Sequence, residues 1–294
     1  MPSGRWRIHR RKRKRRSDRE SRSLRIGVAG CGAMGRPMAE ALIAAGFDVM
    51  GYDVRPLSEF DDFGLRMTGD PAELPGRCGA VISVVRDAAQ TRELLAAMGG
   101  LPPILVLSST LSPRFVRTLR DELPAATALV DAPMSGAPYR ARSATLTFMV
   151  GGPDDAVRQL MPAFRAMGEE IHVLGATGAG AAAKVLNNFV AAAGVAAVRT
   201  VLAQAGALGL PPERLLRVMR SSSGGTWYGD NLERIDWAAE TYDPANTIGI
   251  LEKDVTAYLD AVAGDRPADG LTEAVLERLR GLPALPDLDD QGRV

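Results

Sequence analysis

Cysteine and histidine are scarce in this chain of 294 residues, which contains two of each. Two cysteines build no disulfide framework and suit a reducing compartment, so a cytoplasmic location is expected. Two histidines, His9 and His172, are too few for a multi-histidine metal site, and no metal is expected. No stretch approaches about 18 uninterrupted apolar residues, which excludes a typical transmembrane helix. The hydrophobic content of 46% is still sufficient for the cores of about two domains.

Lysine is also rare, since it occurs only at positions 12, 14, 184 and 253, while arginine supplies the other positive charges. Arginine stays protonated, whereas a desolvated lysine can release its proton. Lys184 follows the turn Gly178-Ala179-Gly180 in a stretch of Ala, Val and Leu that predicts a long helix. Asn188 is one turn further on, so an ammonium and an amide share a helix face, as proton transfer to a bound oxygen requires. A surface lysine is the alternative, and the apolar neighbours argue against it.

Positive charge is distributed unevenly along the chain. Residues 1–23 contain nine Arg and two Lys against Asp18 and Glu20, a net charge of +9, so the rest carries −8 of the total of +1. A stretch of this composition cannot bury a core and is expected to be disordered. It could bind nucleic acid or an anionic surface, and a solvated leader or a misassigned start codon are the alternatives. It lacks the apolar segment of a signal peptide.

A glycine-rich turn follows an apolar strand that the sequence predicts over residues 24–29. The turn has the spacing GxGxxG and consists of Gly30, Cys31, Gly32, Ala33, Met34 and Gly35. In such a turn Gly30 permits a sharp bend, Gly32 lets backbone amides approach a pyrophosphate, and Gly35 lets helix and strand pack closely. The diphosphate is expected at the N-terminus of the helix that follows. The turn therefore predicts a dinucleotide site, with a purely structural bend as the alternative.

The next predicted strand ends at Asp53, about twenty residues after the turn, as in dinucleotide-binding folds. Asp53 is expected to accept hydrogen bonds from the adenosine ribose and to repel a 2′-phosphate, which favours NAD over NADP. Arg55 leaves NADP open, because its guanidinium could pair with that phosphate.

Strands and helices continue to alternate along the chain. Residues 80–85 and 104–107 predict buried parallel strands, and Ser112 with Pro113 predicts the start of a helix. Thr110 is therefore expected at the carboxyl edge of the sheet, where ligands of such sheets bind.

A further strand, residues 128–130, leads into the loop Asp131-Ala132-Pro133-Met134-Ser135-Gly136. This loop offers the hydroxyl of Ser135 and the backbone amide of Gly136 to a carboxylate, and an ordinary turn is the alternative. Strands over residues 146–150 and 171–174 complete the predicted sheet.

The composition changes from Ala181 onward. Residues 182–208 predict a helix of about seven turns that is apolar on most sides and is therefore expected to be buried. No convincing strand follows, so the remainder predicts a helical domain. Within it, Trp227 and Tyr228 belong to a loop that could close over a substrate. Residues 282–294, rich in Pro and Asp, are expected to be a disordered tail.

Four motifs in this order resemble the β-hydroxyacid dehydrogenase family, which includes 3-hydroxyisobutyrate dehydrogenase and tartronate semialdehyde reductase. They consist of residues 30–39, 131–136 and 178–188 and the pair Lys253-Asp254. The resemblance spans about residues 24–265 and implies an α/β fold. In it, an N-terminal Rossmann dinucleotide-binding domain, residues 24–184, is joined by a long helix to an all-helical domain, residues 185–281. Members of the family are usually homodimers or homotetramers.

The resemblance also implies the roles of the substrate-binding residues. Lys184 would be the general acid/base of an NAD(P)-dependent hydroxyacid dehydrogenase (EC 1.1.1.-). It would take the hydroxyl proton as hydride leaves for the nicotinamide. Asn188 would hydrogen-bond the substrate, while Ser135 and the backbone of Gly136 would hold its carboxylate.

For the cofactor, the resemblance places Thr110 near the nicotinamide ribose and Lys253 near both the nicotinamide and the substrate. The substrate motif differs from the family pattern at Ala137, where the family usually has a second glycine, followed here by Pro138 and Tyr139. The sequence therefore leaves the identity of the hydroxy acid open.

The predicted function is hydride transfer between NAD(P) and a small hydroxy acid similar to 3-hydroxyisobutyrate or 2-hydroxy-3-oxopropionate. An imine reductase on the same scaffold is one alternative, and those proteins usually lack the lysine found here at Lys184. A second is a non-catalytic nucleotide-binding protein tethered to nucleic acid by residues 1–23, in which Lys184 and Asn188 would be unexpected.

Overall fold

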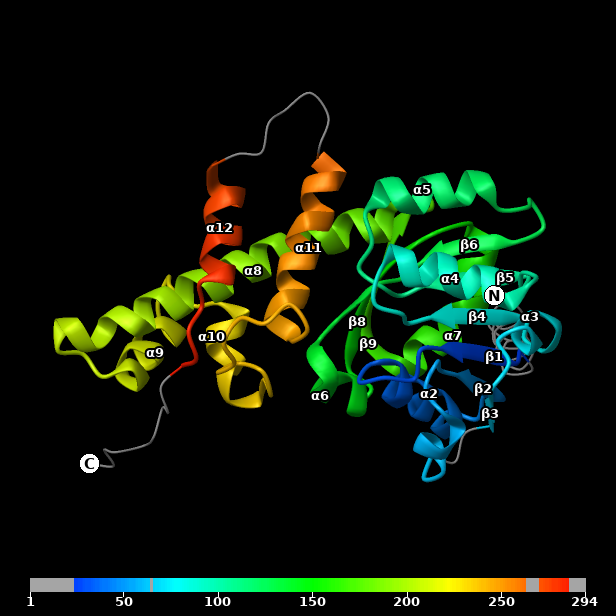
Figure 1. Ribbon diagram of the computed structural model, residues 1–294, viewed down its shortest axis with the longest axis horizontal. Helices are drawn as coiled ribbons and strands as arrows, with labels where there is room; N and C mark the ends of the chain where they lie inside the picture. The colour runs from blue at the N-terminus through cyan, green and yellow to red at the C-terminus, as the bar shows by residue number, and fades with distance from the viewer. Residues whose placement is uncertain (1–23, 64–65, 263–269, 286–294) are drawn as a thin grey trace, which may run out of the picture. The chain divides into compact units, whose positions relative to one another are not determined.

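The computed structural model describes residues 24–63, 66–262 and 270–285 (Figure 1). The chain divides into two compact units, of which the first ends at Lys184 and the second begins at Val185. The basic stretch over residues 1–23 lies outside the described residues, so the expectation that it is disordered or binds nucleic acid stays a prediction.

A single sheet organises the first unit. Its strands are β1 (Ile26–Ala29), β2 (Val49–Tyr52), β3 (Arg66–Thr68), β4 (Ala80–Ser83), β5 (Ile104–Leu107), β6 (Ala128–Asp131), β7 (Met134–Ser135), β8 (Leu146–Gly151) and β9 (Gly168–Gly175). The order is β3-β2-β1-β4-β5-β6-β8-β7, with β9 paired to β8. The strands from β3 to β6 are parallel, and β8 is antiparallel to both β6 and β7. The parallel part has the order of a doubly wound dinucleotide-binding sheet, which confirms the predicted Rossmann fold.

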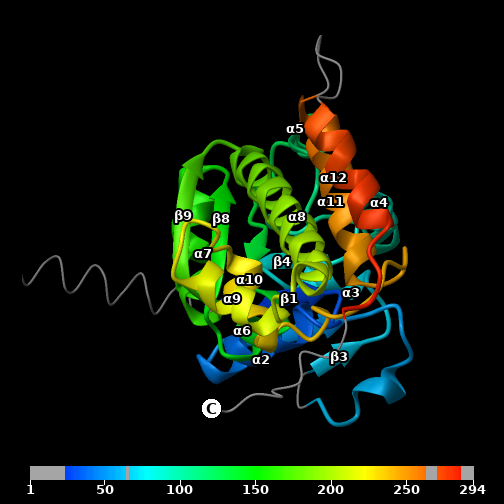
Figure 2. The same cartoon turned by 90° about the vertical axis from the view of Figure 1, so that its left-hand side faces the viewer.

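Helices cover both faces of this sheet (Figures 1 and 2). They are α2 (Gly35–Ala44), the short η1 (Leu57–Phe60), α3 (Glu73–Arg77), α4 (Ala88–Met98), α5 (Pro113–Glu122), α6 (Ala137–Arg142) and α7 (Asp154–Met167). Alternate strand residues serve opposite faces. Ile104 and Val106 of β5 belong to the apolar cluster that includes α2 and α7, whereas Leu105 and Leu107 belong to the cluster that includes α5. Both faces are buried, which explains why these strands are continuous apolar runs.

Local sequence signals set several of these boundaries. Ser112 accepts a hydrogen bond from the backbone N–H of Arg114 and caps α5, and Pro113 is the first helical residue, as predicted. Two short strands, β3 and β7, were not predicted, because three and two residues carry no periodic pattern.

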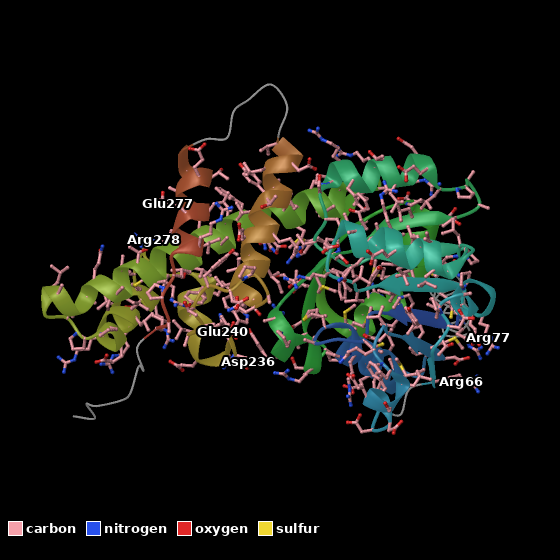
Figure 3. The ribbon with its side chains drawn as sticks, viewed as in Figure 1. Arg66, Arg77, Asp236, Glu240, Glu277 and Arg278 are labelled. Atoms are coloured by element: carbon pink, nitrogen blue, oxygen red, sulfur yellow. The ribbon has the colours of Figure 1, made fainter. Side chains whose placement is uncertain are left out.

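The second unit contains helices joined by turns and loops, and its described residues include no strand. Its elements are the main part of α8 (Ala179–Ala205), η2 (Gly206–Leu208), α9 (Pro212–Arg220), α10 (Trp227–Asn231), η3 (Leu232–Arg234), α11 (Thr247–Val262) and α12 (Gly270–Arg280). On α12, Val275 and Leu279 enter the core, while the charged side chains of Glu277 and Arg278 are exposed (Figure 3). The predicted helical domain and its long connecting helix are thus confirmed.

The chain after α12 continues into the core of the second unit. Leu282 and Leu285 are 3% and 9% exposed. The buried guanidinium of Arg199 on α8 donates to the carbonyl oxygens of Pro283 and Ala238. The expectation of a disordered tail from residue 282 is therefore wrong for residues 282–285, because apolar contacts and backbone hydrogen bonds retain them. Residues 286–294 lie outside the described residues.

Helix α8 is less buried than its composition predicted. Leu186, Val190 and Val201 are 54%, 70% and 38% exposed. At about 100° per residue they fall within one narrow sector of the helix. By length and composition alone, residues 179–208 could cross a membrane, and 44% of the apolar window is buried inside the protein.

Candidate active site

The glycine turn has the geometry that a bound dinucleotide requires. Gly30 has φ +95°, and a Cβ there would lie 2.6 Å from the carbonyl oxygen of Val84. A Cβ on Gly35 would lie 1.8 Å from the oxygen of Gly30, so only glycine lets α2 start this close to β1. A Cβ on Gly32 would meet nothing within 4 Å, so open space borders the turn at this residue. The missing side chains thus permit a sharp turn with room for a ligand beside it.

The start of α2 completes this cradle. Met34 precedes the helix and makes no side-chain cap hydrogen bond. Arg36 N–H donates to the carbonyl oxygen of Gly32 (3.1 Å) and Pro37 has no N–H, so the helix start favours a diphosphate mainly through the positive end of the helix dipole. The turn and the helix start together fit a dinucleotide cofactor.

Asp53 connects the end of β2 to the glycine turn. Its Oδ2 accepts a hydrogen bond from the backbone N–H of Cys31 (2.8 Å), and its Oδ1 accepts from the backbone N–H and Nε of Arg55 (3.1 and 3.0 Å). Burial raises the pKa of Asp53, but the hydrogen bonds from Arg55 and Cys31 outweigh that effect and lower it. Asp53 is therefore held as a carboxylate beside the turn.

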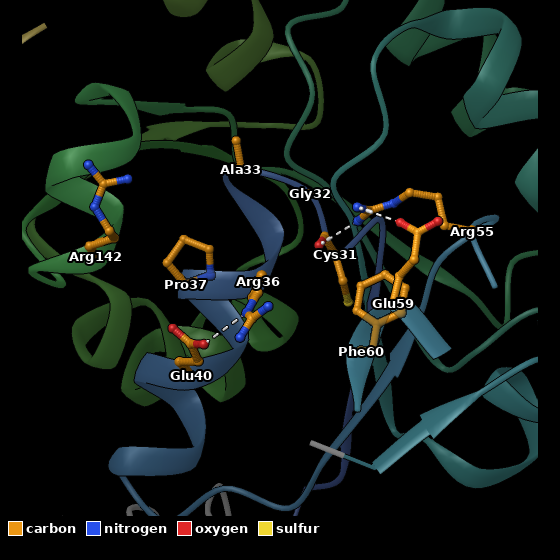
Figure 4. Close-up of a pocket in the computed structure, with 10 residues that line it drawn as sticks. All are labelled: Cys31, Gly32, Ala33, Arg36, Pro37, Glu40, Arg55, Glu59, Phe60 and Arg142. Atoms are coloured by element: carbon orange, nitrogen blue, oxygen red, sulfur yellow. Dashed lines mark hydrogen bonds and ion pairs between the residues drawn. The ribbon is translucent and has the colours of Figure 1, made fainter. Parts of the chain in front are cut away.

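A cavity of about 320 Å³ borders the glycine turn (Figure 4). Its lining includes Cys31 and Gly32 of the turn and the guanidinium-bearing residues Arg36, Arg55 and Arg142. Arg55 lies over the ring of Phe60 at 4.7 Å and donates to the carbonyl oxygen of Cys31 at 3.1 Å. The cavity thus combines an aromatic ring with guanidinium groups, of which Arg36 and Arg55 also pair with the lining carboxylates of Glu40 and Glu59. Guanidinium groups can bind the phosphates of a dinucleotide.

The loop that the sequence predicts to bind substrate follows β6. Ser135 is half-buried at the end of β7, and Gly136, with φ +141°, precedes α6. Ala137 has φ +57°, in the left-handed region that an L side chain rarely adopts. Ala137, where the family usually has glycine, thus has a backbone conformation that glycine adopts freely.

Lys184 lies near the start of α8 and is 7% exposed. The carboxylate of Asp131, at the end of β6, accepts hydrogen bonds from the backbone N–H groups of Gly178 (2.6 Å) and Ala181 (2.7 Å). Burial raises the pKa of Asp131, and these hydrogen bonds partly offset that effect. In the sequence, Asp131 stands out only as the first residue of the substrate motif, and no local signal indicates this pairing.

A second group of polar residues forms within the helical unit. Asn188 on α8 donates through Nδ2 to Oδ2 of Asp254 (2.5 Å), and Lys253 donates through Nζ to Oδ1 of the same carboxylate (2.6 Å). Asn188 and Asp254 are 8% and 3% exposed. The buried carboxylate of Asp254 therefore joins two residues that the sequence proposed separately.

Two other predicted residues have different surroundings. Thr110 is half-buried between β5 and α5. Tyr228, expected in a loop over the substrate, is 2% exposed and donates to the carbonyl oxygen of Ala238 (2.7 Å), so it belongs to the core of the helical unit. The expectation for Tyr228 is wrong because an aromatic residue in a polar stretch does not reveal that its ring is buried.

A lysine and an amide, the side chains of Lys184 and Asn188, are groups that acid–base chemistry commonly uses. Among the described residues, no group of three His, Cys, Asp or Glu side chains is arranged to hold a metal ion. The described candidate residues offer lysine, amide, hydroxyl, carboxylate and backbone groups for binding and for proton transfer.

Two family models cover most of the chain. Residues 25–175 match the NAD binding domain of 6-phosphogluconate dehydrogenase, and residues 178–280 match the NAD-binding domain of NADP-dependent 3-hydroxyisobutyrate dehydrogenase. The L-threonate dehydrogenase of Cupriavidus necator is 34% identical over 249 residues, which are 81% of this chain and 83% of that protein. The chain belongs to the β-hydroxyacid dehydrogenase family.

Other family members agree with this assignment. Human mitochondrial 3-hydroxyisobutyrate dehydrogenase is 31% identical over 230 residues, covering 75% of this chain and 68% of the human protein. The Mycobacterium tuberculosis 3-hydroxyisobutyrate dehydrogenase, solved with L-serine, has a TM-score of 0.71 and 28% identity over 87% of this chain and 92% of that one. The chain is therefore an NAD(P)-dependent hydroxyacid dehydrogenase of this family.

Proposed function

We propose that this chain oxidises a small hydroxy acid with NAD(P), or reduces the corresponding semialdehyde, and that Lys184 is the general acid/base. The observation that carries the proposal is a buried lysine on the first turns of α8, with the amide of Asn188 one turn further along the same helix. A lysine, unlike an arginine, can exist in the neutral form that accepts a proton.

In the oxidative direction, the neutral amine of Lys184 accepts the proton of the substrate hydroxyl. When bound, NAD(P) supplies the hydride acceptor, so the carbinol carbon loses a hydride and becomes a carbonyl. In the reductive direction, the ammonium of Lys184 returns the proton to the oxygen. Asn188 orients that oxygen by a hydrogen bond, and Ser135 with the backbone of Gly136 holds the carboxylate.

The substrate class is a small carboxylic acid that carries a hydroxyl near its carboxylate, such as 3-hydroxyisobutyrate or 2-hydroxy-3-oxopropionate in its reduced form. Two relatives support this class, since one is named for L-threonate and another was solved with L-serine, and both compounds are hydroxy acids. The lysine at position 184 argues against an imine reductase.

For the cofactor, the proposal assigns the diphosphate to the backbone of Gly30, Gly32, Ala33, Met34 and Gly35. It assigns the adenosine ribose to Asp53 and the nicotinamide end to Thr110 and Lys253. Asp53 favours NAD, because its carboxylate would repel the 2′-phosphate of NADP and already engages Arg55. NADP remains the alternative if Arg55 leaves Asp53 for that phosphate.

The proposal extends to the assembly of the protein. The apolar side chains of Leu186, Val190 and Val201 form an exposed stripe on α8. A stripe of this kind supports a homodimer or homotetramer, in which a second copy would cover it. A cytoplasmic location is part of the same proposal, since both cysteines are buried and unpaired.

The experiment is to measure NADH and NADPH formation with a panel of 2- and 3-hydroxy acids, for the native protein and for Lys184→Ala. The substitution is expected to lower kcat by roughly 10²- to 10⁴-fold, the usual scale for a general acid/base, with little change in cofactor affinity. Lys184→Arg is the matched variant, because it keeps a positive charge that cannot be released. Near-native turnover in either variant would remove this lysine from the mechanism.

A further inference from the structure

The N-terminus of α8 is held by one buried carboxylate. Asp131 is 1% exposed, and its two oxygens accept from the N–H groups of Gly178 (2.6 Å) and Ala181 (2.7 Å), which are 47 and 50 residues further along the chain. The hydroxyl of Thr177 adds a hydrogen bond to the carbonyl oxygen of Leu129 on the same strand (2.9 Å). The helix therefore begins at a position that β6 determines.

The surroundings of this carboxylate leave almost no free space. A Cβ on Gly151, which pairs with Asp131 across β6 and β8, would lie 2.8 Å from Asp131 Oδ1. A Cβ on Gly180 would lie 3.0 Å from Asp131 Oδ2 and 2.8 Å from its backbone oxygen. Two glycines thus let β8 and α8 close around the carboxylate, which restricts its position.

This contact lies between the two parts of the first unit that carry candidate catalytic and substrate-binding groups. Lys184 is three residues after Ala181, so its Cα lies about 4.5 Å along the helix axis from the residue that Asp131 holds. The substrate loop with Ser135 and Gly136 begins at the residue after Asp131. A shift of the contact would therefore change the distance between the amine and the carboxylate-binding loop.

We propose that Asp131 is a positioning residue for catalysis, whose carboxylate fixes the start of α8 and thereby places Lys184 relative to the Ser135–Gly136 loop. This inference rests on the proposed function of Lys184. A neutral Ser or Asn cap would also satisfy a helix N-terminus, and it would avoid burying a charge. The carboxylate differs from such a cap because its two equivalent oxygens hold two N–H groups at once.

The test is a double-mutant cycle on kcat with Asp131→Asn and Lys184→Ala. The asparagine replaces one acceptor oxygen by an NH₂ group that faces a backbone N–H, so the start of α8 must shift. A misplacement of about 1 Å can lower turnover by 10²-fold, and we expect a loss of about 10- to 100-fold in the native background. The Kd for the cofactor should stay within about twofold, because the substitution is remote from the glycine turn.

In the Lys184→Ala background, the same Asp131→Asn substitution is expected to change kcat by less than about threefold, because the amine that it positions is gone. Turnover there is raised to a measurable level with added ethylamine, an amine that is not attached to α8. Equal losses of kcat in both backgrounds would overturn the proposal, since a merely structural residue would impair both equally.

One control variant and one substitute variant separate positioning of Lys184 from a general loss of stability. Asp87→Ala removes the side-chain cap of α4, where Asp87 Oδ1 accepts from Gln90 N–H (3.0 Å), and it should lower the unfolding temperature without changing kcat. If Asp131→Asn does not accumulate as folded protein, Thr177→Val replaces it, since this substitution removes only the hydrogen bond from the Thr177 hydroxyl to the carbonyl oxygen of Leu129. Thr177→Val should lower kcat less than Asp131→Asn, and it should not lower kcat in the Lys184→Ala background. A kcat loss from Thr177→Val that persists without the lysine would refute the proposal. Unchanged kcat in Lys184→Ala itself would instead refute the proposed function.

Discussion

Replacing Asp53 by alanine is expected to weaken NAD binding and to shift the cofactor preference toward NADP. The side chain of Asp53, at the end of β2, is 8% exposed. Its carboxylate accepts hydrogen bonds from Cys31 N–H and from Arg55. Its removal deletes the proposed acceptor for the adenosine ribose. It also removes one of the partners of the Arg55 guanidinium, which is 44% exposed and can then pair with a 2′-phosphate.

The size of the change in cofactor preference follows from the hydrogen bonds that NAD and NADP would each make to the native protein and to the Asp53→Ala variant. A hydrogen bond to a charged group contributes about 1.5–3 kcal/mol, and each 1.4 kcal/mol is a tenfold change in Kd, so NAD affinity should fall by about 10- to 100-fold. The affinity for NADP should rise, because the substitution removes a carboxylate that repels the 2′-phosphate and lets Arg55 pair with that phosphate. Loosening of the glycine turn affects both cofactors alike. The ratio of the NAD affinity to the NADP affinity should therefore fall by about 100-fold.

Titration calorimetry with NAD and with NADP measures both dissociation constants. Asp48→Ala is the matched control, because Asp48 pairs with Arg25 (2.6 Å) at the other end of β2 and should leave the ratio unchanged. An Asp53→Ala protein with an unchanged ratio would show that this carboxylate does not contact the ribose.

Two further predictions concern the same unit. Burial, together with the charge of Asp53, raises the pKa of the Cys31 thiol to about 12. At pH 8 the thiolate fraction of Cys31 should then be about 10³-fold below that of a free cysteine. Alkylation of Cys31 by iodoacetamide should therefore be slower by about that factor, and it should become faster as the pH rises. Alkylation at the rate of a free thiol would contradict this. Ala137→Gly should raise the free energy of unfolding in urea by about 1 kcal/mol, because glycine adopts the left-handed conformation without strain. Ala141→Gly in the same helix should lower it, and equal effects of the two substitutions would refute the strain at Ala137.

Much of the first unit was predictable, because its signals are local. The GxGxxG spacing and the apolar strands depend on residues that are close in the chain, and the sheet order follows from their alternation with helices. The capped start of α5 at Ser112 and Pro113 is equally local. These features suffice to identify the Rossmann domain and the family from the amino-acid sequence.

Other features depend on surroundings that composition does not reveal. Residues 282–285 begin a stretch rich in Pro and Asp that is typical of a tail, yet Leu282 and Leu285 fill the core of the helical unit. Tyr228 lies in a stretch that predicts a loop over the substrate, although its ring is buried. Leu282 and Leu285 exchange backbone hydrogen bonds with Tyr242 and Ala239, residues far away in the sequence. Tyr228 contacts Trp237 and Ala238, which lie beyond the short stretch that suggested a loop.

The amino-acid sequence determined which groups are available: a rare lysine, an amide one helical turn away, a carboxylate after the second strand and a turn with three glycines. Only the tertiary structure decided which partner each group has. Asp131 meets residues 47 and 50 positions away, and Asn188 meets Asp254 across 66 positions. The physical reason is that hydrogen bonds require distances near 3 Å, and chain folding alone brings such distant residues that close.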